Sequence, residues 1–133
     1  MKEEDRKLLL KDLSARLPYG VKAYVKNWSK LDRKYYEGVY TVESIHPSLN
    51  NVAASSDKFY VEVILGYDDY VIKPYLFPMS SMTKEQEIMI CALQDMGIAY
   101  YHLIIDHYNE WHLDYRDFIE KGLAIDATGL NIY

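Results

Sequence analysis

The sequence contains few of the residues that disulfide-bonded, membrane-spanning and phosphate-binding proteins require. Its single cysteine, Cys91, cannot form an internal disulfide and lacks partners for a zinc site, so we expect a reducing, cytoplasmic environment. The apolar run near the N-terminus, Leu8 to Leu10, is too short for a signal peptide or a membrane span. Six thinly spread glycines form neither a phosphate-binding loop nor a dinucleotide fingerprint. These absences argue against a secreted protein, a membrane protein and a nucleotide-dependent enzyme.

Tyrosine and charge are the two unusual features of the composition. The chain has 133 residues, of which 50% are hydrophobic and 26% charged, as expected for one globular domain over 1–133. Its 14 tyrosines outnumber the three phenylalanines and two tryptophans together. The net charge of −5 hides an asymmetry: residues 1–34 carry ten Lys/Arg and five acids, whereas residues 35–133 carry five Lys/Arg and 15 acids. A basic N-terminal quarter therefore precedes an acidic remainder.

The N-terminal part of the chain predicts a helix followed by a small sheet. Leucines at helical spacing and an acidic start indicate a helix over 3–16, which Pro18 ends. Stretches rich in β-branched and aromatic residues predict three or four strands, at 21–28, 38–45, 58–65 and a short one at 70–72. Residues 46–57 have the composition of a polar loop, and Pro74 is expected outside the sheet because proline has no N–H to donate. We expect a strongly bent antiparallel sheet of SH3-like barrel type over 18–78.

Beyond the β-rich region the sequence changes to helical periodicity. Thr83 and Gln86 have the spacing of a capping box at the start of a helix. An apolar stripe on this helix is expected to face the core, at Ile88, Cys91, Ala92 and Met96. A second helix is predicted over 99–111, with an apolar face made of Tyr101, Ile104, Ile105, Tyr108 and Trp111. The order of elements predicts an α+β protein with an N-terminal helix (1–17), a β-rich region (18–78) and a helical region (79–133).

The segment HLDYRDFIEKGLAID, residues 112–126, combines four acids with an arginine, a histidine and a glycine. We interpret it as a capped two-turn helix and not as a site. Asp114 is the expected N-cap, and Gly122 is the expected left-handed residue of a Schellman C-cap. Arg116 and Glu120 are spaced to pair across one turn. The candidate functional residues are therefore those of the β-rich region.

No combination of residues indicates catalysis or a bound metal. The histidines at 102, 107 and 112 are spaced five apart, whereas a zinc pair on a helix requires a spacing of four. Four residues that are each four apart form a stripe of possible ligands for a divalent ion: His102, Asp106, Glu110 and Asp114. The stripe lies opposite the apolar face of the same helix, so we interpret it as a solvated side. The chain also lacks a nucleophile motif. We therefore predict a non-enzymatic protein without a cofactor or a metal.

The surplus of tyrosine favours a protein-interaction surface. Tyrosine has a large, stiff, amphipathic side chain that is enriched at interfaces. Six aromatic residues of the β-rich region are candidates for binding a protein partner: Tyr24, Trp28, Tyr35, Tyr36, Tyr60 and Tyr75. The five tyrosines among them are expected to line a groove for an extended peptide. The alternative is that most of these tyrosines are half-buried with a solvated hydroxyl. A protein-binding module is the function that we favour.

An alternative function is nucleic-acid binding by the basic and aromatic stretch VKAYVKNWSKLDRKYY, residues 21–36. Its cations are candidates for contacting phosphates while the neighbouring aromatic rings stack on bases: Lys22, Lys26, Lys30, Arg33 and Lys34. Lysines on an exposed strand also protect a sheet edge from pairing with other chains. The acidic remainder of the protein opposes a long polyanion.

Three segments of the chain stand out as motifs: LLLKDLSARLPYGVK (8–22), KPYLFPMSSMT (73–83) and LDYRDFIEKGLAIDA (113–127). Together they resemble a family of small proteins encoded by gut Bacteroidetes and their mobile elements. The chain departs from the commoner pattern at Phe77, where a basic residue is usual, and at Asp117, where a glycine is usual. The resemblance implies no activity, cofactor or catalytic residue. Its mobile-element setting, together with the acidic charge, suggests a third hypothesis, an inhibitor of a host defence protein.

Overall fold

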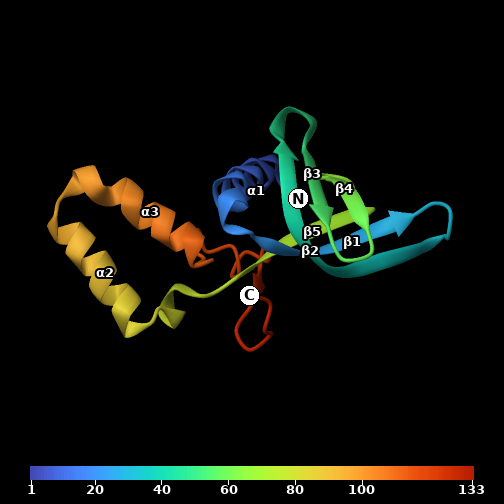
Figure 1. The fold of residues 1–133 in the computed structure, drawn as a ribbon. Coiled ribbons are helices and arrows are strands. Elements are labelled where there is room, and N and C mark those ends of the chain that lie inside the picture. The colour runs from blue at the N-terminus through green and yellow to red at the C-terminus, as the bar shows by residue number, and fades with distance from the viewer.

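The protein has a helix-covered sheet at its centre, a projecting hairpin at one end and a helical arm at the other (Figure 1). A computed structural model describes all 133 residues. The elements are α1 (Glu3–Arg16), β1 (Lys22–Ser29), β2 (Lys34–His46), β3 (Asn51–Ser55), β4 (Tyr60–Ile64), β5 (Tyr70–Leu76), α2 (Lys84–Asp95), α3 (Tyr101–Glu110) and β6 (Ile125–Asp126). The predicted α+β class is confirmed.

Helix α1 covers one face of the sheet and has the predicted bounds. Three acids in its first turn lie at the positive end of the helix. Leu9 and Leu13 are fully buried against the sheet and belong to a core of 17 residues. The chain leaves the helix through a 3-10 turn that contains Pro18, and Gly20 (φ 68°) then turns it into β1. Local signals therefore place both ends of this helix.

The six strands form one open, mixed sheet in the order β4-β3-β2-β1-β5-β6. All pairs are antiparallel except β5 with β6. No hydrogen-bonded pair joins β4 to β5, so the sheet does not close. The expectation of an SH3-like barrel is therefore wrong. A bulge in β2 between Val42 and Ser44 bends the sheet without closing it.

Strand β3 lies inside the stretch that was expected to be a polar loop. Its central residues Val52, Ala53 and Ala54 are all buried, so the strand lacks the alternation of a half-exposed strand. Strand β2 begins at Lys34, four residues before the predicted start, because it pairs with β1 over the whole hairpin. In both cases the residues that form the strand are determined by pairing with a neighbouring strand and not by local composition.

Pro74 lies within β5 and not outside the sheet as expected. It pairs with Ala23 of β1, while β6 pairs only with the two following residues, Tyr75 and Leu76. The proline thus lies where β5 has a single partner strand, which is the kind of position that a sheet tolerates. It is buried in the protein.

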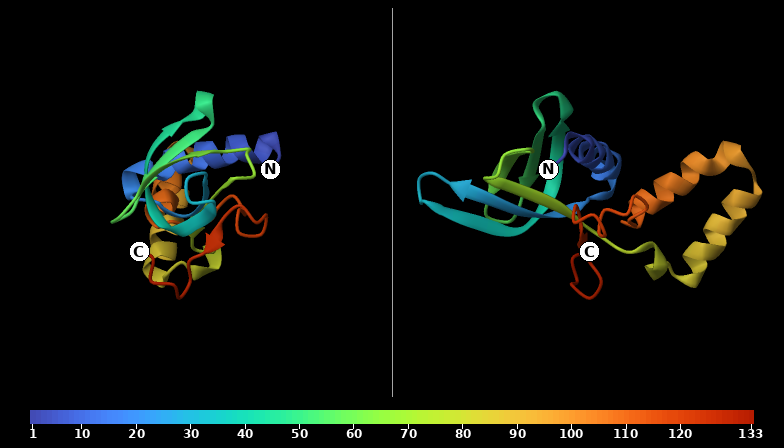
Figure 2. Two further views of the ribbon diagram at one scale, coloured as in Figure 1. Left: turned by 90° about the vertical axis from the view of Figure 1, so that its right-hand side faces the viewer. Right: turned by 180° about the vertical axis from the view of Figure 1, so that it is seen from behind.

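Residues 79–111 form a helical arm that extends from the sheet, as Figure 1 and the right-hand view of Figure 2 show. The capping box predicted at its start is present: the side chain of Thr83 accepts from the Gln86 backbone N–H, and the Gln86 side chain accepts from the Thr83 N–H. The stripe expected to face the core is instead exposed, with Ile88 at 62%, Met96 at 56%, and Cys91 and Ala92 also exposed. Periodicity identified the stripe correctly, but no part of the chain covers it.

Residues 112–126 do not form the expected two-turn helix. Asp117 adopts φ 59°, a backbone region that favours glycine, and this interrupts the helical path. Asp114 does cap a turn, because its carboxylate accepts from the N–H groups of Phe118 and Ile119, each at 2.9 Å. The Schellman prediction is confirmed: Gly122 has φ 75°, and the Leu123 N–H donates to the Phe118 carbonyl at 2.8 Å. The segment is a capped turn and not a helix.

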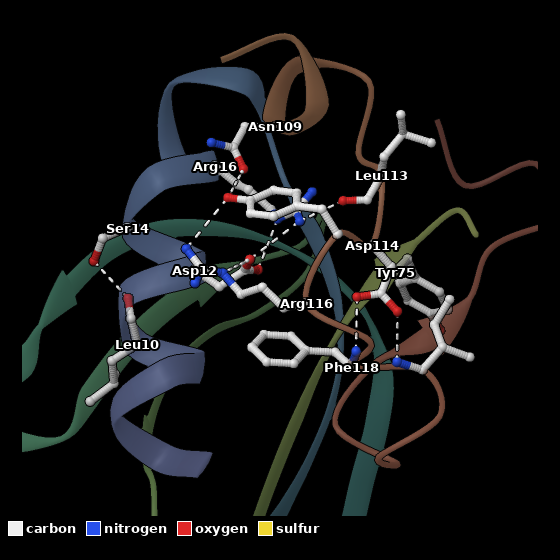
Figure 3. Close-up of polar contacts among 12 residues, drawn as sticks. Leu10, Asp12, Ser14, Arg16, Tyr75, Asn109, Leu113, Asp114, Arg116 and Phe118 are labelled. Carbon is white, nitrogen blue, oxygen red and sulfur yellow. Dashed lines mark hydrogen bonds and ion pairs between the residues drawn. The ribbon is translucent and has the colours of Figure 1, made fainter. Parts of the chain in front are cut away.

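A buried ion cluster ties α1 to the C-terminal segment (Figure 3). Arg16 donates from Nε to Asp12 at 2.8 Å and from Nη2 to the Leu113 carbonyl at 2.6 Å. Arg116 donates from Nε to the same carboxylate at 3.1 Å, so it does not pair with Glu120 as predicted. Asp12 and Arg16 are both fully buried. The cluster joins segments about a hundred residues apart in sequence.

Candidate functional site

The hairpin of β1 and β2 carries four of the six aromatic residues that the sequence singled out, on two different faces. Residues two apart on a strand share a face, and directly paired residues of neighbouring strands share one too. The face turned away from α1 is here called the outer hairpin face. Its residues are Lys22, Tyr24, Lys26 and Trp28 of β1 with Tyr35, Glu37, Val39 and Thr41 of β2. Three of the six candidate aromatic residues therefore lie together.

Trp28 and Tyr35 form the centre of the exposed aromatic surface. They are cross-strand partners, with ring centroids 4.9 Å apart in an edge-to-face arrangement. Lys26 places its ammonium 4.4 Å from the centroid of the Tyr35 ring. Tyr35 is 46% exposed, and Val39, four residues further along the same face of β2, is 42% exposed. The hairpin thus holds large rings at the surface in fixed positions.

Tyr24 and Glu37 add a polar pair to this face. The Tyr24 hydroxyl donates to the Glu37 carboxylate, and this hydrogen bond raises the pKa of Tyr24 to about 12. Tyr24 therefore stays neutral, and its proton is held by a carboxylate. Glu37 also lies directly opposite Lys26. The pair places a hydroxyl group and a carboxylate on the outer hairpin face.

The opposite face of the hairpin holds a second aromatic group around Tyr36. A groove of about 340 Å³ is lined by nine residues, among them Tyr36, Tyr40, Phe59, Tyr60 and Asp32, and Trp28 also reaches its edge. The ring of Tyr36 lies 6.0 Å from that of Phe59, and its hydroxyl donates to Asp32, which raises the pKa of Tyr36. Tyr60 is 62% exposed at this groove. The six predicted partner-binding residues do not line one groove.

Tyr75 does not belong to an accessible surface. It is only 7% exposed and lies beneath the C-terminal residues. The Tyr133 hydroxyl donates to the Tyr75 carbonyl at 2.8 Å and accepts from the Lys22 N–H at 3.0 Å. The Tyr133 ring also stacks on His112, with centroids 3.7 Å apart. Tyr75 therefore leaves little surface for a partner to contact, and its partner-binding role stays a prediction.

The five basic residues of the alternative nucleic-acid site are also divided. Lys22 and Lys26 lie on the outer hairpin face, and Lys22 donates to the Ile132 carbonyl at 3.1 Å. Lys30 and Arg33 lie in the turn between the strands. Lys34 lies on the groove face, 4.8 Å from the centre of the Tyr36 ring. No single face presents all five cations.

The expected stripe of possible metal ligands is interrupted. Asp114 lies beyond the end of α3, and its carboxylate is occupied by two backbone N–H groups. No group of three or more His, Cys, Asp or Glu side chains lies close enough to hold a metal ion. None of the helices combines the length and the apolar character that crossing a membrane requires.

Three contributions to these surfaces could not be found in the sequence. Val71 and Lys73 of β5 join the outer hairpin face because they pair with Lys26 and Tyr24. Strand pairing depends on residues that are far apart in the sequence, so no local pattern predicts it. The exposed apolar residues of the arm are the third contribution. Their periodicity was visible, but their exposure was not.

Comparison with models of protein families, with curated protein sequences and with solved structures finds no match to this chain. Its function must therefore be argued from the arrangement of its own residues.

Proposed function

We propose that this protein is a non-enzymatic protein-binding module that uses the outer hairpin face. The observation that carries the proposal is the packed pair of Trp28, which is half-buried, and Tyr35, which is exposed, on a projecting hairpin, with Lys26 above the Tyr35 ring. Aromatic residues and cations at the centre of a surface are typical of binding hot spots. Because the rings are packed on each other and held by strand pairing, a partner loses little affinity to ordering them.

Two features favour a protein partner over a nucleic acid. Base stacking requires open ring faces, whereas Lys26 covers one face of Tyr35. The carboxylate of Glu37 lies among the cations of this surface and opposes a polyanion. A protein partner with apolar and carboxylate groups suits the same surface.

The test compares captured partners for two variants. Trp28→Ser combined with Tyr35→Ser removes the aromatic centre, and Leu49→Ser changes an exposed leucine in the turn between β2 and β3 (68% exposed) as a matched control. Each purified protein is incubated with nuclease-treated extract of the cells that encode it. We expect the unaltered protein and Leu49→Ser to retain the same protein, and the double variant to lose it. Equal retention by all three would overturn the proposal.

A separate experiment tests the alternative function of nucleic-acid binding. Binding of a fluorescent single-stranded oligonucleotide is measured at low and high salt, with Lys26→Glu combined with Lys30→Glu as the variant. We expect no binding that depends on these lysines. Tight binding that weakens steeply with salt and is lost in the variant would replace the protein-binding proposal.

A further inference from the structure

The helical arm carries a group of exposed apolar side chains. Six large apolar residues of the arm are exposed: Ile88, Met89, Met96, Ile98, Tyr101 and Ile105. Ile98, at the turn between the two helices, is 82% exposed. Single exposed apolar residues are common, but a group of them on one projecting element marks an interaction site.

Helix α2 has little intramolecular support. Nine of its twelve residues are exposed, and Ile90 is its one buried residue. A helix of this length is marginal in water without tertiary packing, and a capping box contributes only about 1 kcal/mol. The stripe of Ile88, Ala92 and Met96 runs along one side of the helix at four-residue spacing. A partner surface that covers this stripe would supply the missing packing.

Charge indicates what that partner surface is like. The arm, residues 79–111, carries one lysine and five acids, so two arms repel each other. A suitable partner is basic and also has exposed aromatic or apolar groups. The hairpin of this same chain has both properties: residues 22–41 carry five Lys/Arg and two acids, and Leu31 at the tip is 92% exposed.

The arm and the hairpin of one molecule cannot meet, because they project from opposite ends of the sheet (Figure 1, Figure 2). We propose that the arm of one copy binds the hairpin of a second copy, head to tail. The exposed stripe of α2 packs on the aromatic surface of the hairpin, and the arm's acids lie near the hairpin's cations. This proposal rests on the proposed function, since it identifies a second copy as one protein that the outer hairpin face binds.

Head-to-tail contact has a distinctive consequence. Each copy keeps one free arm and one free hairpin, so association continues into open chains of copies unless the rotation closes a ring. Attraction between exposed charges is strongly screened at an ionic strength of about 1 M, where the Debye length is about 3 Å. The association therefore weakens with salt, unlike one that rests on apolar contacts alone.

Two variants separate this arrangement from other dimers. Ile88→Ser combined with Met96→Ser disables the arm and leaves the hairpin intact. Lys30→Glu combined with Arg33→Glu reverses charge at the hairpin tip and leaves the arm intact. Sedimentation of the full chain measures the mass of each variant alone and of the two mixed in equal amounts, with Leu49→Ser as a control and circular dichroism as the check on folding.

We expect unaltered protein and Leu49→Ser to form species larger than the monomer at low salt, and each double variant alone to remain monomeric. The mixture is expected to form a heterodimer and nothing larger, because only one intact arm and one intact hairpin remain to pair. Three results would each overturn the proposal: the unaltered protein is monomeric, the variant with Lys30→Glu and Arg33→Glu still associates with itself through its intact arm, or the mixture of the two variants stays monomeric. If the purified chain is monomeric while capture from extract still depends on Trp28 and Tyr35, only the self-association is wrong and the proposed function stands.

Discussion

Replacing Asp12 by asparagine is expected to destabilise the fold more than any other conservative change in α1. The Asp12 carboxylate is fully buried and accepts from Arg16 at 2.8 and 3.2 Å and from Arg116 at 3.1 Å. An amide at this position keeps one acceptor oxygen, carries no charge, and turns N–H donors toward two guanidinium groups. The buried charge of Arg16 is then uncompensated.

Removing one partner of a buried ion pair costs about 3–5 kcal/mol, which is a large share of the stability of an ordinary domain. For a chain of this size the melting temperature is expected to fall by about 10–20 °C. The matched control is Glu3→Gln, which removes a carboxylate from the same helix. Glu3 lies 3.4 Å from Lys7, and both side chains are largely exposed. Its loss is expected to cost no more than about 0.5 kcal/mol.

Urea unfolding followed by circular dichroism measures both variants against the unaltered protein. If Asp12→Asn and Glu3→Gln are equally stable, the buried cluster does not join α1 to the C-terminal segment as described. A large loss in Asp12→Asn with an unchanged m value indicates that stability alone has changed.

Two further predictions concern the backbone and the pH dependence of stability. Gly122→Ala is expected to lower the free energy of unfolding by about 1–2 kcal/mol because Gly122 has φ 75°. Gly38→Ala is the control and is expected to change stability by less than about 0.5 kcal/mol, because its new Cβ only meets the Tyr40 ring at 3.7 Å. Equal effects of the two changes in thermal unfolding would refute the strain argument. Burial, and to a smaller extent the charges of Arg16 and Lys22, lowers the pKa of His112 from 6.5 to about 4. The imidazole of the unfolded chain therefore binds a proton more readily than that of the folded chain, so the free energy of unfolding decreases as the pH falls from 6.5 toward 4. Full burial would give about 3 kcal/mol, and partial exposure of the ring reduces the expected loss to about 1–2 kcal/mol. This loss of stability at low pH is expected to be smaller in His112→Asn, because asparagine tolerates the left-handed backbone at this position (φ 57°) and does not titrate. An unchanged pH dependence of stability in urea unfolding would contradict the prediction.

Features governed by neighbouring residues could be predicted from the sequence. The bounds of α1 follow from its acidic start, its leucine spacing and Pro18. The capping box at Thr83 and the Schellman turn at Gly122 are likewise built from residues a few positions apart. In each case the chemistry lies within one or two helical turns.

Features governed by distant contacts could not be predicted. Strand β3 and the placement of Pro74 in β5 depend on which strands become neighbours. The expected two-turn helix fails because Arg116 turns to Asp12, a residue of α1, and Asp117 takes a left-handed backbone.

The candidate site divides in the same way. The alternation of residues along β1 accounts for Tyr24 lying on the same face as Lys22 and Lys26. The separation of Tyr36 onto the other face follows from the register of β2, and the burial of Tyr75 follows from contacts with Tyr133. The sequence therefore identified suitable residue types, and the pairing of strands determined which of them lie together.

The most direct test of the central claim places a photo-crosslinking amino acid at Tyr35 and, as a control, at Leu49. Both positions are exposed, but only Tyr35 lies on the outer hairpin face. Light is applied to cells that express each variant, and the products are separated by mass. We expect a protein adduct at position 35 and none of the same mass at position 49. Adducts at neither position, or the same adduct at both, would contradict a protein-binding surface on this hairpin.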